Sequence, residues 1–276
     1  MTRHATTAWG SPAILFPGGG PAFFPPGWIE RIRRIGFGLV ATLAIVGHAA
    51  PAAAVESRAN SAGERFEVTS IKAVRPTIAD TIAALEQRDV ARAKAAFEAY
   101  DSAWNGIEVY INTRSKDLYD VLEHGFQARI EKALAAPNPD VAALLADAQA
   151  MLAKYDEAID MVAKAAPLNP LYDDVARLRI VRAHLREVIP ALKAGNIAKA
   201  RKSFAAFDDT WDSIEDLIKA RSADGYVAIE KGMIEIEQAL MPEKPDVARV
   251  TGLVNDVMAK YNAGVAEVVK EARSRP

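Results

Sequence analysis

The sequence carries two matching sets of acidic side chains whose spacing could hold a cation. The first set is Asp101, Glu108 and Glu123, and the second set is Asp208, Glu215 and Glu230. Glu108 and Glu123 lie seven and eight residues on either side of Ser115, where a turn between two helices is expected. On adjacent antiparallel helices the two carboxylates should therefore lie at similar height. Because hard cations prefer oxygen ligands, the pattern predicts a metal site in each half of the chain.

A second interpretation of the same carboxylates is structural. Arginines recur beside both sets, at Arg75 and Arg114 and again at Arg182 and Arg221. Guanidinium groups at the edge of a helical core can neutralise carboxylates and fix the register of the helices. Under this alternative the acidic side chains form ion pairs that stabilise the fold.

The residue types present exclude several other kinds of site. The chain has no cysteine, and neither His124 nor His184 recurs at the matching position of the other half, where Lys231 and Thr77 stand. Zinc, copper, haem and iron–sulfur sites are therefore disfavoured, as is a di-iron centre, which needs paired Glu-x-x-His motifs. Neither a P-loop nor a G-x-S-x-G motif is present, so we expect no enzyme activity. The formal net charge of -2 gives no basic footprint for nucleic acid.

These side chains stand in an internal repeat. Shifting the chain by 107 residues aligns 97–126 with 204–233 without a gap, and 13 of the 30 positions are identical. Past this block the offset is 106, which pairs 139–141 with 245–247. Identity at this level over an ungapped block indicates a duplication.

The elements that position the carboxylates are predicted to be helices. Apolar residues recur three and four apart, as in the spacing of helices with one buried face. The breaks divide the chain into eight helices, near 71–87, 90–113, 116–135, 140–165, 172–194, 197–220, 223–240 and 246–272. The expected core pairs are Phe97/Phe204, Trp104/Trp211, Ile107/Ile214, Ile111/Ile218 and Leu134/Leu240. We predict an all-α protein of two tandem homologous four-helix repeats, 55–166 and 167–276, either as one bundle each or interlocked about a pseudo-twofold axis.

Two small residues survive in both halves at places where helices need them. Ser115 and Ser222 stand at expected helix starts and should be N-caps. Gly125 and Gly232 stand inside expected helices, where glycine is unfavourable. Their retention predicts the close approach of a neighbouring helix.

Residues 1–54 differ in composition from the rest of the chain. Ser11 to Gly27 is rich in proline and glycine and should be disordered. Arginines then precede an uncharged apolar run that ends in small residues at Ala52–Ala54, so 29–54 is predicted to be a cleavable signal peptide; an uncleaved membrane anchor is the alternative. Cleavage removes four arginines and one glutamate and leaves 30 basic against 35 acidic side chains, a net charge of -5. The expected location is periplasmic or secreted.

One family resemblance rests on residues that recur in both halves. The second half contains Gly195–Asn196, Ala200, Phe204, Trp211, Ile214–Glu215, Tyr226 and Ile229–Glu230, and the first half contains Asp89, Phe97, Trp104, Ile107–Glu108, Tyr119 and Leu122–Glu123. This pattern resembles the periplasmic helical region associated with bacterial high-affinity iron permeases of the oxidase-coupled type. The chain lacks the membrane spans and the Arg-Glu-x-x-Glu motif of the permeases themselves.

The resemblance implies an exported accessory protein in iron uptake. Glu108, Glu123, Glu215 and Glu230 would then be ligands of iron or another hard divalent cation, supported by Asp101 and Asp208. A periplasmic or membrane protein would be the expected macromolecular partner. The alternative function is a helical scaffold or protein-interaction module in which the duplicated glutamates and arginines are structural.

Overall fold

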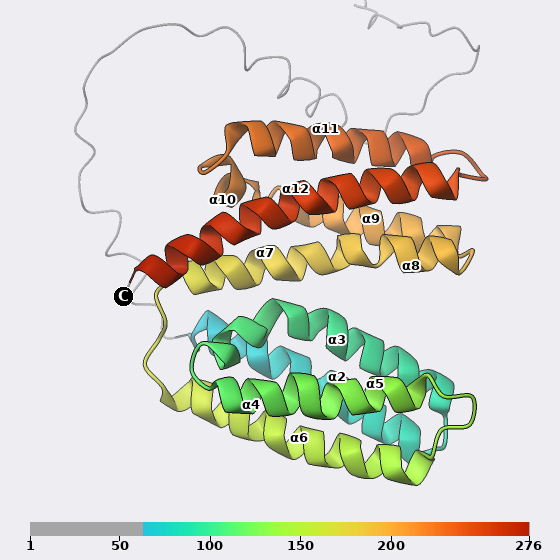
Figure 1. The fold of residues 1–276 in the computed structure, drawn as a ribbon, viewed down its shortest axis with the longest axis vertical. Helices are drawn as coiled ribbons and strands as arrows, with labels where there is room; N and C mark the ends of the chain where they lie inside the picture. Colours follow the sequence, from blue (N-terminus) through green and yellow to red (C-terminus); the bar gives the residue numbers. More distant parts are fainter. Residues whose placement is uncertain (1–62, 276) are drawn as a thin grey trace, which may run out of the picture. The chain divides into compact units, whose positions relative to one another are not determined.

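A computed structural model describes residues 63–275 of the chain (Figure 1). Within this range every regular element is a helix, which confirms the predicted all-α class. The predicted leader and signal peptide lie outside the described residues. Among the residues described, no helix combines the length and the apolar character that a membrane span requires.

The first half contains four helical stretches. They are α2 (Phe66–Glu86), α3 (Val90–Asn112), a run made of α4 (Lys116–Asp120), the π-helix η3 (Val121–Gln127) and α5 (Ala128–Leu134), and finally α6 (Val141–Lys164). Helix α2 packs against α3 and α6, and η3 and α5 also pack against α6. Figure 1 shows these helices side by side in blue to yellow-green.

The second half repeats this order of neighbours. Its elements are α7 (Leu171–Arg186), α8 (Val188–Lys193), α9 (Ile197–Trp211), α10 (Glu215–Lys219), α11 (Ala223–Leu240) and α12 (Val247–Ser274). Helix α7 packs against α9 and α12, and α11 packs against α12. The helices α7 and α8 thus take the place that α2 has in the first half.

Each half encloses its own apolar core. Trp104 and Trp211 are fully buried, one in each cluster. All ten residues of the predicted core pairs are buried. Matching tyrosines tie the helices together, because the Tyr155 hydroxyl donates to the carbonyl of Ile71 (2.7 Å) and the Tyr261 hydroxyl to that of Leu178 (2.6 Å).

The helix ends confirm both predicted caps and one of the two predicted close contacts. Ser115 accepts a hydrogen bond from a backbone N–H three residues on (3.2 Å), and Ser222 does the same (3.0 Å). At Gly232 an added Cβ would lie 2.3 Å from Val257 Cγ2, so glycine permits α11 and α12 to approach closely. At Gly125 the nearest atom would be 3.7 Å away, so the prediction of a close contact there was wrong. Gly125 lies instead within the π-helix η3.

Two predicted helices are interrupted. The helix predicted at 172–194 breaks at Glu187, shortly before Pro190, which lacks the N–H for a helical hydrogen bond and whose ring crowds the preceding turn. The helix predicted at 197–220 breaks between α9 and α10. There the hydroxyl of Thr210 donates to Ala206 O (2.6 Å) and that of Ser213 donates to Thr210 O (2.6 Å), and such local bonds compete with helical ones.

Candidate functional site

The predicted carboxylates of the first half meet an aromatic pair at the edge of the core. The indole Nε1 of Trp104 donates a hydrogen bond to Glu123, which η3 positions. The ring of Tyr119 stacks on the same indole, with centroids 6.2 Å apart and planes 12° apart. Glu123 is therefore held from one side by a buried donor.

Glu108 takes a partner from the other half of the molecule. Its carboxylate accepts from Nη1 of Arg179 on α7 at 2.8 Å, and both side chains are 20% exposed. Burial raises the pKa of Glu108, and so does the negative charge of Glu123, while Arg179 opposes the shift. The pKa of Glu123 is also raised, first by burial and further by Asp101, although the Trp104 bond lowers it. The three predicted acids of this half thus feel one another's charge.

The carboxylate of Asp101 accepts hydrogen bonds from neighbouring polar side chains. Its Oδ1 accepts from the side-chain amide of Gln127 at 2.8 Å and from that of Asn105 at 3.3 Å. Arg186 of α7 approaches its other oxygen at 3.9 Å. Asp101 therefore contributes to the packing of α3 on η3 and faces α7.

The second half reproduces the tryptophan–glutamate bond. Trp211 Nε1 donates to Glu230, which is only 2% exposed, and Tyr226 stacks on Trp211 with centroids 6.3 Å apart. Glu215 is the first residue of α10 and Asp208 lies on α9, each partly buried. We call the two arrangements, Trp104 with Glu123 and Trp211 with Glu230, the Trp–Glu centres.

The grouping of acidic side chains around the Trp–Glu centres bears on the predicted metal site. Among residues 63–275, no group of three or more histidine, cysteine, aspartate or glutamate side chains is placed to hold a metal ion. The carboxylates are instead engaged by indole and guanidinium donors. This geometry favours the structural interpretation of the duplicated acids.

The arginines predicted to neutralise these acids were wrongly assigned. Each pairs with a different group: Arg75 with Asp156, Arg114 with Glu67, Arg182 with Asn262 and Arg221 with Glu271. The physical reason is helix packing, because Arg75 of α2 reaches Asp156 on α6 and Arg182 of α7 reaches Asn262 on α12. Glu108 is neutralised by Arg179, for which the matching residue of the first half is Lys72.

The two halves meet where α3 crosses α7. Glycine makes the close approach possible, since a Cβ added at Gly106 would lie 2.5 Å from Ile180 Cγ1 and 3.4 Å from the backbone nitrogen of Ile180. On either side of this point, Tyr110 donates to Asp173 (2.8 Å) and Ser102 donates to Glu187 (3.0 Å). Polar bonds thus flank an apolar contact.

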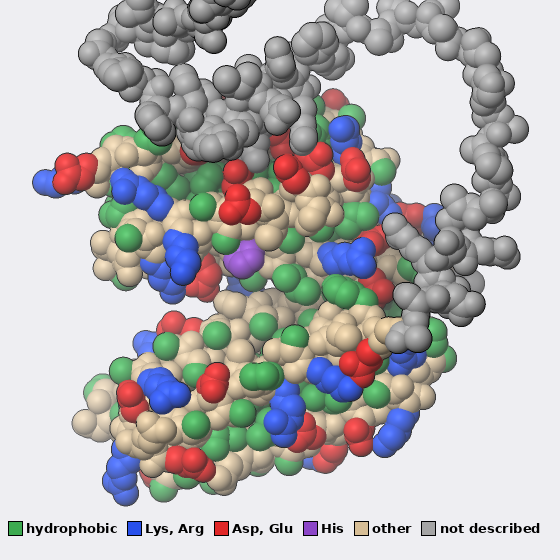
Figure 2. All heavy atoms as spheres, turned by 180° about the vertical axis from the view of Figure 1, so that it is seen from behind, with side chains coloured by type: hydrophobic (Ala, Val, Ile, Leu, Met, Phe, Trp, Pro, Cys, Tyr) green, Lys and Arg blue, Asp and Glu red, His purple; other side chains and the backbone are tan. Residues whose placement is uncertain are grey.

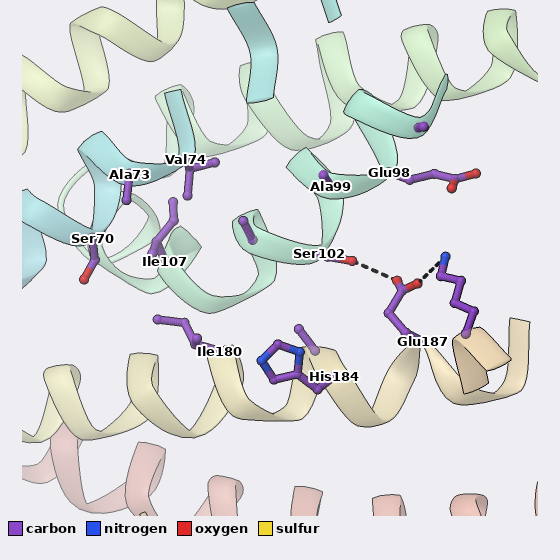
Figure 3. A pocket seen from close by; sticks show the side chains of 14 residues that line it. Ser70, Ala73, Val74, Glu98, Ala99, Ser102, Ile107, Ile180, His184 and Glu187 are labelled. Atoms are coloured by element: carbon purple, nitrogen blue, oxygen red, sulfur yellow. Dashed lines mark hydrogen bonds and ion pairs between the residues drawn. The ribbon is translucent and has the colours of Figure 1, made fainter. Parts of the chain in front are cut away.

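A cavity of about 580 Å³ opens beside this contact. We call it the junction cavity. Figure 3 shows it between α2, α3 and α7, with Ile180 and His184 rising from α7 and Ser102 facing Glu187. Figure 2 shows a hollow between the halves on the face opposite to that of Figure 1. The lining comprises Ser70, Ala73, Val74, Ala95, Glu98, Ala99, Ser102, Ala103, Ile107, Ile180, Ala183, His184, Glu187 and Lys199.

The junction cavity combines an apolar body with a polar end. Its walls carry five alanines and three branched aliphatic side chains, and this small-residue lining leaves the space open. At the polar end Glu187 binds both Ser102 (3.0 Å) and Lys199 (3.1 Å), with Glu98 nearby on the lining. Its volume and composition lie within the range of small-molecule pockets.

The sequence analysis did not identify the junction cavity. A signal was present, because Ala95, Ala99 and Ser102 form a stripe of small residues on α3 with helical spacing. Small residues alone do not distinguish a tight helix contact from an open space. Only the docking of α7 on α3 creates the cavity.

Comparisons with protein-family models, with curated proteins and with solved structures found no match to this chain. The resemblance to the helical region of iron permeases therefore stays a prediction. The function of the chain must be argued from its own residues.

Proposed function

We propose that this chain is a non-enzymatic helical binding protein, built from a duplicated unit, that takes a small ligand in the junction cavity. The observation that carries the proposal is the cavity of about 580 Å³ where α3 crosses α7. Ligand pockets in proteins are mostly apolar, of this size, and carry a few convergent polar groups.

The charges at the polar end define the ligand class. Glu187 pairs with Lys199, and the exposed Glu98 adds a second carboxylate to the lining, so the charged side chains of the lining sum to a negative charge. A cationic donor on the ligand would be attracted to this end, while an anionic group would be repelled. The alanine walls suit a compact aliphatic or aromatic body. The proposed ligand is therefore a small apolar amine.

The test compares amines with acids of the same carbon skeleton. Isothermal titration of the full chain with octylamine, octanol and octanoate should give the tightest binding for octylamine. Ala99→Leu adds bulk on the lining and should weaken binding about tenfold or more, which is 1.4 kcal/mol. Ala205→Leu is the matched control, because Ala205 is an exposed alanine on α9 outside the cavity.

A charge variant separates the polar end from the walls. Glu187→Gln removes one carboxylate and should weaken octylamine binding while leaving octanol binding unchanged. Equal binding of amine and acid, or binding that Ala99→Leu leaves intact, would contradict the proposal.

A second candidate function is the binding of a hard cation, such as iron, at the Trp–Glu centres. The observation that favours it is the gathering of acids: Glu108 and Glu123 are both half-buried, burial raises the pKa of each, and the negative charge of Glu123 raises that of Glu108 further. A cation between the two carboxylates would relieve their repulsion. The resemblance to the iron-permease region supports the same assignment for Glu215 and Glu230, with Asp101 and Asp208 in support.

The indoles offer a direct readout of cation binding. A cation that takes Glu123 or Glu230 from the indole Nε1 should change tryptophan fluorescence, and changing all four glutamates, Glu108, Glu123, Glu215 and Glu230, to glutamine should abolish the response. Trp104→Phe and Trp211→Phe assign the signal to one half or the other. Metal affinity that survives the four changes would exclude this candidate.

We also propose that the chain acts in the periplasm or outside the cell, with its partner a ligand or another exported protein. The basic, apolar and small-residue parts of 29–54 support export. Mass spectrometry of the exported protein should find a new N-terminus at about residue 55. Recovery of the intact chain in the membrane fraction would favour the uncleaved anchor.

A further inference from the structure

A second cavity, of about 490 Å³, lies along α7 and α12 in the second half. We call it the basic cavity. It is lined by Arg179, Arg182, Asn262, Val265, Ala266, Val269, Lys270 and Arg273. Four of these eight side chains are cationic, and no aspartate or glutamate is among them.

The two α7 arginines that line the basic cavity, Arg179 and Arg182, do not have all their hydrogen-bond donors paired. Arg179 bonds Glu108 at 2.8 Å and Arg182 bonds the amide oxygen of Asn262 at 2.8 Å. The Nε atoms of both are buried, and within residues 63–275 neither has a hydrogen-bond partner. Burial and the neighbouring charges of Arg179 and Arg186 lower the pKa of Arg182. Several positive charges are thus held close together in a half-buried place, where they repel one another.

The matching place in the first half has its charges neutralised. Arg75, which matches Arg182, makes two hydrogen bonds to Asp156, at 2.6 and 2.9 Å. Lys164, which matches Lys270, pairs with Asp160 at 3.1 Å. In the second half, the two aspartates are replaced by Asn262 and Ala266.

The replacements remove both carboxylates but keep both cations. If these ion pairs served only to stabilise the fold, replacing their acids would not increase stability, because each remaining cation would lack an opposite charge. Glu108 is already engaged by Arg179, although its charge also acts on Arg182, and Glu271 is engaged by Arg221 and Arg275. An external anion would restore the balance that Asp156 and Asp160 provide in the first half.

We propose that the basic cavity binds a small organic phosphate. Guanidinium groups match phosphate oxygens in geometry and charge. The floor of Val265, Ala266 and Val269 offers an apolar surface for the organic body. The volume exceeds what a lone inorganic ion would fill. This site is independent of the junction cavity.

The test uses phenyl phosphate as the probe, with inorganic phosphate and benzyl alcohol standing in for its charged and its apolar part. Titration calorimetry and thermal unfolding of the full chain should show binding and a raised Tm for phenyl phosphate. Inorganic phosphate should bind about tenfold more weakly, and benzyl alcohol should not bind. Arg182→Gln with Lys270→Gln should abolish binding of the phosphate. Arg249→Gln with Lys260→Gln, at one exposed and one half-buried position of α12 outside the cavity, should leave binding unchanged.

A second pair of changes restores the first half's chemistry. Asn262→Asp with Ala266→Asp adds the two missing carboxylates and should abolish phenyl phosphate binding without lowering the Tm of the free protein. Binding that persists in this variant would overturn the proposal, as would failure of the unmodified chain to bind phenyl phosphate. Equal affinity for inorganic phosphate would overturn the role of the apolar floor. Ala99→Leu, which tests the junction cavity, should leave all these results unchanged.

Discussion

The two halves share a core and differ in what they do with charge at the surface. Both bury a tryptophan that donates to a glutamate, and both anchor a tyrosine hydroxyl on a backbone carbonyl. Between the first and last long helices of each half, the first half pairs Arg75 with Asp156, while the second half pairs Arg182 only with the amide of Asn262. The two halves therefore share these packing contacts, while the partners of their matching charged side chains differ.

The halves also differ in where their helices are distorted. The first half keeps α3 continuous but contains the π-helix η3, whereas the second half keeps α11 regular but breaks between α9 and α10. Helix α3 is covered by α7 at Gly106, and the matching residue of the second half, Ser213, is exposed. The helix that packs against a neighbour at this position, α3, is thus continuous, whereas the helix with the exposed Ser213 is broken.

The largest effect is expected at the Trp–Glu centres. Trp211→Phe removes the indole donor to Glu230, which is 2% exposed, so a nearly fully buried carboxylate loses the indole hydrogen bond. We expect a loss of about 2–4 kcal/mol of unfolding free energy, and a smaller loss for Trp104→Phe because Glu123 is less buried. Urea unfolding checks the order. Equal losses in the two halves would contradict the burial difference.

The next effect concerns the contact between the halves. Gly106→Leu places a side chain where Ile180 packs and should cost about 1–3 kcal/mol, since the helices must separate. Ser213→Leu is the matched change in the second half and should stay within about 0.5 kcal/mol, because the position is exposed. Thermal unfolding compares the two variants. The idea fails if Gly106→Leu is as mild as Ser213→Leu.

The unfolding free energy should depend on pH through two acids of the first half, Glu108 and Glu123. The pKa values of Glu108 and Glu123 are raised from 4.5 in the folded state, so these two carboxyl groups hold more protons in the folded chain than in the unfolded chain. Their contribution to stability therefore falls as pH rises from about 4.5 through the folded pKa values. Glu108→Gln with Glu123→Gln should flatten this part of the curve of unfolding free energy against pH. Glu86→Gln with Glu157→Gln, at two exposed positions, is the control; an equal flattening there would contradict the assignment.

The smallest effect is expected from exchanging the surface charges. Asp156→Asn breaks a pair whose side chains are both more than 40% exposed, so the loss should be below about 1 kcal/mol. The change leaves Arg75 with an amide, as Arg182 is in the second half. Asn262→Asp should shift stability slightly in the opposite direction. Chemical denaturation in low salt gives the clearest reading, and a loss that does not shrink in high salt would argue against an electrostatic origin.

Local patterns predicted the elements well. The spacing of apolar residues identified the buried faces that contain Phe97 and Ile111, and the serine N-caps at Ser115 and Ser222 were correctly placed. These features depend on residues within a few positions of one another, so the sequence carries them directly. The break after Trp211 was missed because the hydroxyls of Thr210 and Ser213 compete with the helix only in certain rotamers.

The partners of charged groups could not be predicted in the same way. Glu108 and Arg179 are 71 residues apart, and nothing local in either segment marks them as a pair. Arg75 and Arg114 were assigned to the wrong acids because each can reach several helices, and the packing selects one.

By itself, the sequence determined the helices, their buried faces, their caps and the correspondence between the halves, since each follows from spacing along the chain. The tertiary structure alone decided which charges meet, where the junction cavity opens and which side chains gather in the basic cavity. Cavities form where two surfaces fail to fill the space between them, and an ion pair depends on distances across helices. Both are set by how α7 docks on α3 and α12, which short-range spacing does not specify.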